Sequence, residues 1–118
     1  DGGTRTASIS GGFVALYIAV EKLKKNYNIQ KPIIKEFIGA GSTGIINGKA
    51  NLDLDYHEDS AAEVDANFVI CESGKISEIQ ATGEEYFFSE EQFNEIFKLA
   101  KEGIKNIIKK QKEVLGLS

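Results

Sequence analysis

The 118-residue sequence has the length and composition of a single small domain covering residues 1–118, with 42% hydrophobic and 27% charged residues. Its formal net charge of −4 argues against broad, non-specific nucleic-acid binding, although a local cationic site remains compatible with it. No apolar run approaches the roughly 20 residues that span a membrane, and no signal-peptide pattern opens the chain. Its one cysteine, Cys71, has no internal disulfide partner, so we expect a reducing, cytoplasmic location.

The first predicted element is an amphipathic helix over residues 8–27. Its apolar residues recur at steps of three and four positions, as on a helix with one buried side; they are Ile9, Phe13, Leu16, Val20 and Leu23. Thr6 or Ser8 is expected to cap its start, because short hydroxyl side chains accept hydrogen bonds from the free amides of a first turn. Pro32 prevents a longer helix.

Two hairpins are predicted to follow a buried strand over residues 33–42. Asn47 and Gly48 separate two β-prone runs, and this pair suits a two-residue turn. In the second arm of that hairpin, leucines and Tyr56 alternate with Asp53 and Asp55, which predicts one buried and one acidic face. The segments 67–71 and 75–82 form the second predicted hairpin, around a turn at residues 73–74.

A second amphipathic helix is predicted over residues 89–115. Ser89 stands three positions before Gln92, as in a capping box. The apolar stripe of this helix consists of Phe93, Ile96, Phe97, Ala100, Ile104, Ile107 and Ile108. The order helix, four strands, helix predicts an α/β fold of the α+β kind: a two-layer sandwich with a mainly antiparallel sheet and both helices on one face.

The glycine-rich start of the chain is a candidate anion site. Gly2 and Gly3 allow the backbone to approach a ligand closely, and the free amides of a helix start attract negative charge. Thr4 adds a hydroxyl donor, and Arg5 adds a planar fork that can hold phosphate through two hydrogen bonds. The alternative is a simple capping turn with Arg5 in solvent.

An acidic segment between residues 53 and 65 is the second candidate site. Asp59, Glu63 and Asp65 are expected to converge if this loop folds back between the hairpins. Clustered carboxylates bind cations such as Mg²⁺, and one carboxyl group among others can serve as a general acid. The alternative is a solvated acidic loop, in which His57 is a surface residue.

Three motifs together resemble the C-terminal half of the ribonuclease PH family: DGGTRTASISG at residues 1–11, LDLDYHEDSAAEVDANFV at residues 52–69 and SEIQATGEE at residues 77–85. The resemblance implies a phosphorolytic 3′→5′ exoribonuclease that trims tRNA precursors. In that reaction inorganic phosphate, rather than water, attacks the terminal phosphodiester and releases a nucleoside diphosphate. The sequence ATGEE at residues 81–85 departs from the family's usual GTAEG, which puts the local turn in doubt.

The resemblance also implies roles for the two candidate sites. The implied phosphate-binding residues are Gly3, Thr4 and Arg5. The implied metal ligands and general acid are Asp59 and Asp65, with Glu63 as a supporting carboxylate for Mg²⁺ or another divalent cation. Which of the two aspartates donates the proton stays open.

A family subunit is about twice as long as this chain, so the resemblance implies either a C-terminal fragment or one chain of a nicked enzyme, with the N-terminal half of the same enzyme as partner. Alone, the 118 residues are expected to have little activity; a complete enzyme is expected to bind RNA and to form a hexameric ring, a trimer of dimers. A non-catalytic RNA-binding or scaffold subunit of an exosome-like ring is the alternative, and an unrelated α/β module with a structural metal is a third. The retained Arg5, Asp59 and Asp65 favour the enzyme.

Overall fold

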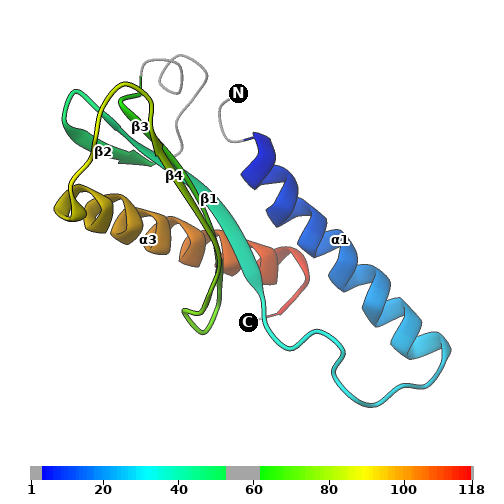
Figure 1. Cartoon of the computed structure of the whole chain (residues 1–118). Coiled ribbons are helices and arrows are strands. Elements are labelled where there is room, and N and C mark those ends of the chain that lie inside the picture. The colour runs from blue at the N-terminus through cyan, green and yellow to red at the C-terminus, as the bar shows by residue number, and fades with distance from the viewer. Residues whose placement is uncertain (1–3, 53–61, 118) are drawn as a thin grey trace.

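A computed structural model describes residues 4–52 and 62–117, the side chain of Thr4 excepted (Figure 1). Its sheet has four antiparallel strands in the order β2-β1-β3-β4. The elements in chain order are α1 (Thr4–Asn26), β1 (Ile38–Ile46), β2 (Lys49–Leu52), β3 (Val64–Cys71), β4 (Ile76–Gly83) and α3 (Glu90–Val114). The predicted α+β fold with two hairpins is confirmed. No helix in these described ranges is long and apolar enough to cross a membrane.

Both predicted hairpin turns are present. Asn47 and Gly48 have φ values of 52° and 77°, the left-handed pair that a two-residue turn requires, and Ile46 pairs with Lys49 across it. Gly74, at φ 94°, serves the β3–β4 turn.

The strand predicted over residues 33–42 is shifted in the structure, because β1 begins at Ile38 and continues to Ile46. The ladder with β3 begins where Ile38 meets Cys71 and runs to Ile45 opposite Val64, and pairing with β2 extends β1 to Ile46 opposite Lys49.

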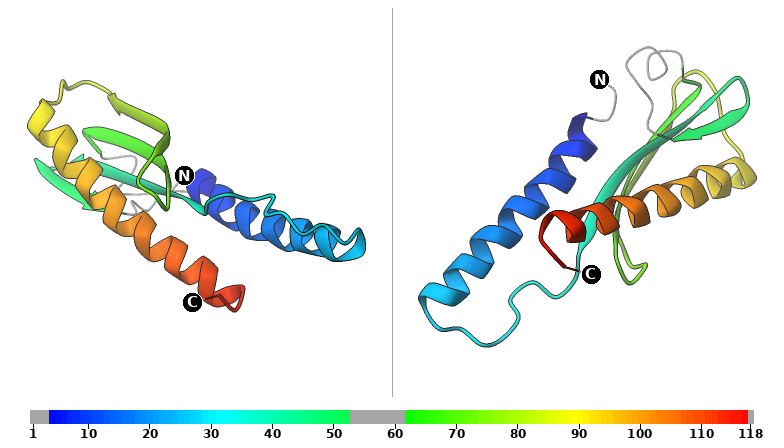
Figure 2. Two further views of the ribbon diagram at one scale, coloured as in Figure 1. Left: turned by 90° about the horizontal axis from the view of Figure 1, so that it is seen from below. Right: turned by 180° about the vertical axis from the view of Figure 1, so that it is seen from behind.

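Helix α3 covers one face of the sheet (Figure 2). The predicted capping box is confirmed: the Ser89 amide donates to Gln92 Oε1 at 2.9 Å, and the Gln92 amide donates to Ser89 Oγ at 3.1 Å. The helix buries Ile96, Ala100, Ile104 and Ile108. Gly41 of β1 permits this close packing, because a Cβ there would lie 3.2 Å from Cγ1 of Ile104.

Helix α1 lies along an edge of β1 rather than flat on the face that α3 covers, which corrects the expected placement of both helices on one face (Figures 1 and 2). Within the described residues, β2 pairs with positions 43–46 of β1, and the backbone of β1 at Ala40 takes its hydrogen-bond partners from α1. Ser10 supplies them: its Oγ accepts from the Ala40 amide at 3.0 Å and donates to the Ala40 carbonyl at 3.4 Å.

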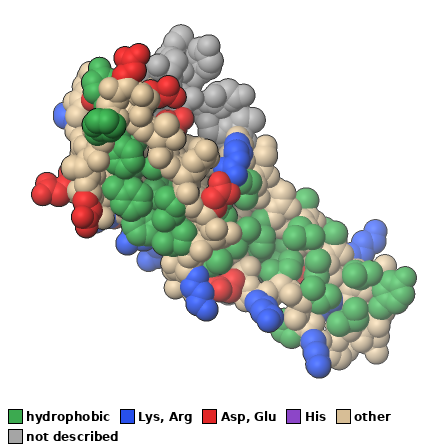
Figure 3. Space-filling view, in the orientation of Figure 1, with side chains coloured by type: hydrophobic (Ala, Val, Ile, Leu, Met, Phe, Trp, Pro, Cys, Tyr) green, Lys and Arg blue, Asp and Glu red, His purple; other side chains and the backbone are tan. Residues whose placement is uncertain are grey.

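The contact with this polar edge also changes which side of α1 is buried. Of the five apolar residues in the predicted stripe only Phe13 is buried, while Leu16 and Leu23 are 54% and 46% exposed. The buried positions near the helix start are instead Thr6 and Ser10. Figure 3 shows hydrophobic side chains gathered at the surface along α1. Neither Thr6 nor Ser8 caps the helix, because α1 begins at Thr4.

Candidate functional site

The start of α1 is hydrogen-bonded to the second face of the sheet, which is the face opposite α3. Thr6 Oγ1 lies 3.3 Å from Ser42 Oγ, and the Ser42 hydroxyl donates to Asn67 Oδ1 at 2.8 Å. This short chain of polar side chains runs from α1 across β1 to β3. Thr6 and Ser42 are both buried, so their hydroxyls are ordered by these contacts.

Asp65 lies on the same face, close to this chain of hydrogen bonds. Alternate residues of a strand share a face, so Asp65, two residues before Asn67 in β3, lies on the same face at a distance of about 7 Å along the strand. In the ladder Asp65 pairs with Gly44 of β1 and with Thr82 of β4. Gly44 is buried, and Asp65 is half-buried. The start of α1 and this predicted site residue therefore lie on the same face of the sheet.

The Arg5 guanidinium takes a different direction. Its Nη2 donates to both carboxylate oxygens of Glu78 on β4, each at 2.8 Å. Glu78 pairs with Val69, two same-side steps beyond Asp65 along β3. The arginine side chain is 53% exposed, so rotation about its side-chain bonds is open to it. In this arrangement Arg5 neutralises Glu78 and is not directed at Asp65.

Glu63 serves the β1–β2 hairpin in this structure. Its Oε1 accepts from the Gly48 amide at 3.1 Å, and its own amide donates to the Ile45 carbonyl at 2.8 Å. The predicted residues Gly3 and Asp59, and with them His57, lie outside the described residues, as does the side chain of Thr4. Within the described ranges, His, Cys, Asp and Glu side chains form no group of three that could hold a metal ion. The carboxylate of Asp65 is nevertheless the ligand type that Mg²⁺ prefers.

The sequence reasoning did not select three residues of this site: Ser42, Asn67 and Glu78. The two hydroxyl residues Ser42 and Thr43 interrupt a strand of otherwise apolar residues and glycines, and this is a signal that could have indicated Ser42. Glu78 lies two residues after Ile76 and directly before Ile79, so no simple alternation in β4 indicates its face or its partner.

The comparisons with known proteins agree with this fold. The model of the 3′ exoribonuclease family, domain 2, matches residues 36–103, and the chain therefore belongs to that family. Curated relatives named ribonuclease PH support this: that of Bacillus subtilis (strain 168) is 51% identical over 117 residues, 98% of this chain and 48% of its own length. That of Listeria welshimeri is 48% identical over 98% of this chain and 47% of its own. The family predicted from the motifs is confirmed.

Solved structures show the same fold. An archaeal exosome core superposes with a TM-score of 0.59 at 14% identity, over 75% of this chain and 37% of its own. The Archaeoglobus fulgidus exosome with RNA bound to the active site gives a TM-score of 0.57 at 12% identity, over 74% of this chain and 35% of its own. The chain spans about half the length of the curated relatives that it matches.

Proposed function

We propose that the chain carries part of the active site of a phosphorolytic 3′→5′ exoribonuclease that trims the 3′ ends of tRNA precursors in the cytoplasm. The observation that carries this proposal is the hydrogen-bonded link from Thr6 through Ser42 to Asn67, because it joins the start of α1 to the strand of Asp65. The membership of the family and the resemblance to ribonuclease PH support the same reaction.

In this proposal inorganic phosphate binds at the start of α1, held by Gly3, Thr4 and Arg5. The amides at a helix start and a guanidinium are both suited to an anion. Because Arg5 is paired with Glu78 in this structure, phosphate binding requires the guanidinium to leave that carboxylate or to share its charge with it. The exposure of the pair keeps this exchange inexpensive in free energy.

The chemical step needs an acid as well as an anion site. An oxygen of inorganic phosphate attacks the terminal phosphorus atom of the RNA, the bond from phosphorus to the 3′ oxygen breaks, and a nucleoside diphosphate is released. Asp59 or Asp65 donates the proton that the departing 3′ oxygen takes up. A divalent cation such as Mg²⁺, when bound by these aspartates, would offset the negative charge of the two phosphate groups. Glu63 is the further carboxylate proposed for it.

Positioning and charge neutralisation account for most of this catalysis, since the nucleophile is already an anion. The chain spans only about half of its relatives' length, so we propose that an N-terminal half of the same enzyme completes the active site. It would contribute a further arginine and most of the RNA-facing surface. The complete enzyme would assemble as a hexameric ring, and the 118 residues alone would have little activity.

The test is reconstitution with the matching N-terminal half of a relative, followed by an assay for phosphate-dependent shortening of a tRNA 3′ tail. We expect Arg5→Ala to raise the phosphate concentration needed for half-maximal rate by about tenfold or more. Asp65→Asn, which keeps the shape of the side chain, is expected to lower the rate at saturating phosphate by at least about 100-fold.

Glu91→Gln is the matched control, because this exposed carboxylate lies on α3, away from the second face. It should trim RNA at the unchanged rate. Normal trimming by both site variants would contradict the proposal, and so would trimming that proceeds equally well without phosphate.

A further inference from the structure

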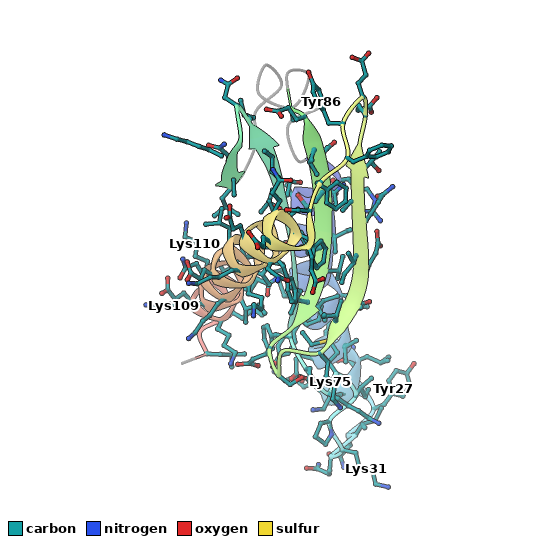
Figure 4. All side chains as sticks on the ribbon, turned by 60° about the vertical axis from the view of Figure 1, so that its left-hand side comes forward. Tyr27, Lys31, Lys75, Tyr86, Lys109 and Lys110 are labelled. Atoms are coloured by element: carbon teal, nitrogen blue, oxygen red, sulfur yellow. The ribbon has the colours of Figure 1, made fainter. Side chains whose placement is uncertain are left out.

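A groove of about 590 Å³ lies on the α3 side of the sheet, between the C-terminal half of α3 and the β3–β4 hairpin. One wall carries four lysines of α3: Lys101, Lys105, Lys109 and Lys112. Ile104 and Ile108 of α3 also line the groove. Residues 70–74, at the end of β3 and in the β3–β4 turn, line its other side. In Figure 4, Lys109 belongs to this part of α3 and Lys75 to the β3–β4 turn.

The four lysines are not equally engaged. Lys112 forms an ion pair with Glu72 and lies 5.4 Å from the centre of the Phe37 ring. Lys101 lies 4.8 Å from the centre of the Phe97 ring. Lys105 and Lys109 are exposed and have no carboxylate partner among the residues that the structure describes. The groove therefore holds positive charge that the protein does not neutralise within those residues.

The helix dipole alone does not account for this placement. It favours cations in the last turn of a helix, whereas Lys101 and Lys105 precede the end of α3 at Val114 by more than two turns. Positions 101, 105, 109 and 112 also fall on one side of α3, spaced by one helical turn each, next to the buried stripe. Lys110, one residue from Lys109, does not line the groove.

We propose that this groove binds the di- or triphosphate group of a small molecule. Lys105 and Lys109 would contact the phosphate oxygens as point charges, and the apolar lysine stems and isoleucines would accommodate the less polar part of the ligand. The volume lies within the ~300–1,000 Å³ typical of small-molecule pockets. Charge complementarity selects a compact anion with several charges.

An RNA strand fits the groove less well. A strand would extend beyond it toward the first turns of α3, which carry Glu90, Glu91 and Glu95 and would repel phosphates. Among the residues that the structure describes, none that lines the groove carries an aromatic ring for a base to stack on. The groove is also separate from the proposed active site, because it opens on the opposite face of the sheet and at the other end of β3, about 20 Å along the strand from Asp65. The inference is therefore independent of the proposed function.

The experiment is an NMR titration of the isotope-labelled 118-residue chain at low salt, with inorganic tripolyphosphate in one arm and ADP in the other, and with adenosine as the uncharged comparison. The amides of Gly74 and Lys105 are expected to shift with both phosphate compounds and not with adenosine. A tighter affinity for ADP would show that the nucleoside contributes, and equal affinities would show that the phosphates suffice. In the Lys105→Ala/Lys109→Ala variant we expect affinity to fall by about tenfold or more.

Control variants test whether a change in binding comes from the groove or only from the change in net charge. Lys110→Ala should change the affinity by less than about twofold, since this lysine does not line the groove. Glu72→Gln should tighten binding because it frees Lys112, whereas Glu113→Gln, with the same change in charge, should not. The proposal is overturned if neither compound binds at millimolar concentration, if Lys110→Ala weakens binding as much as the double variant, or if only an RNA oligonucleotide or an acidic peptide shifts these amides.

Discussion

Arg5 and Glu78 are 73 residues apart in the sequence, and one nitrogen of the arginine donates to both oxygens of the glutamate at 2.8 Å. This contact joins the first turn of α1 to β4, across the two central strands of the sheet. Arg5 is the residue that the motifs predict to bind phosphate, and in this structure its guanidinium is paired with a carboxylate of the same chain. Under the proposed function, an incoming phosphate would compete with Glu78 for the same guanidinium.

The first prediction concerns this competition. Glu78→Gln removes the negative charge but keeps the side-chain shape, so inorganic phosphate should bind several-fold more tightly by isothermal titration calorimetry. The free energy of unfolding should change by less than about 1 kcal/mol, because the pair is exposed.

Glu84→Gln is the control for that experiment. It removes an exposed carboxylate just beyond β4 that has no hydrogen-bond partner among the described residues, and it should leave phosphate affinity unchanged. If Glu78→Gln has no effect, or if both variants have the same effect, Glu78 does not regulate access to Arg5.

The second prediction concerns Gln111, a buried residue of α3 that links three elements. Its Nε2 donates to the carbonyls of Ser10 in α1 and Ile38 in β1, both at 3.0 Å. Gln111→Glu replaces this donor by an acceptor and buries a charge, so urea unfolding should show a loss of at least about 2 kcal/mol. Gln111→Leu should cost less, about 1–2 kcal/mol. The reverse order would contradict a role for the two hydrogen bonds.

The third prediction concerns two glycines with opposite surroundings. A Cβ at Gly83 would lie 2.1 Å from the Tyr86 carbonyl oxygen, whereas a Cβ at Gly11 would meet nothing within 4 Å. Gly83→Ala should therefore destabilise the protein by more than about 2 kcal/mol, because backbone must move. Gly11→Ala should stabilise it by about 0.5–1 kcal/mol through helix propensity. Equal melting temperatures for the two variants would be inconsistent with this turn.

The fourth prediction concerns pH. Hydrogen bonds from Ser73 lower the pKa of Glu36 below its ordinary value of 4.5. A lowered pKa in the folded state stabilises the protein above about pH 4.5, and this contribution disappears as the pH falls through the folded-state pKa. The melting temperature of the wild type should therefore exceed that of Glu36→Gln at pH 7, and the difference should shrink toward pH 3. A difference that does not depend on pH would contradict this contact.

Much of the fold could be predicted because its signals are local. The capping box at Ser89 and Gln92 and the turn at Asn47 and Gly48 depend only on neighbouring residues, and both are present. The placement of α1 could not be predicted in the same way. Its buried side is partly polar because Ser10 hydrogen-bonds the backbone of β1 at Ala40, and a contact over 30 residues leaves no trace in the local spacing of apolar residues.

The candidate site likewise contains residues that the sequence could predict and residues that it could not. Motifs select Arg5 and Asp65, but spacing in the sequence cannot reveal that Glu78 holds the arginine or that Ser42 and Asn67 link α1 to β3. Such partners depend on strand order and register, which are long-range properties. The roles of Gly3, Thr4, Asp59 and Glu63 stay predictions.

The most direct test of the account is whether a cation at Asp65 lies beside the start of α1. Mn²⁺ added to the isotope-labelled chain should broaden the amide signals of Arg5 and Thr6 together with that of Ala66, because a paramagnetic ion acts over a limited distance. Asp65→Asn should abolish this joint broadening while the rest of the spectrum stays unchanged. Broadening around Ala66 that leaves Arg5 and Thr6 sharp would contradict a single site for the phosphate and the cation.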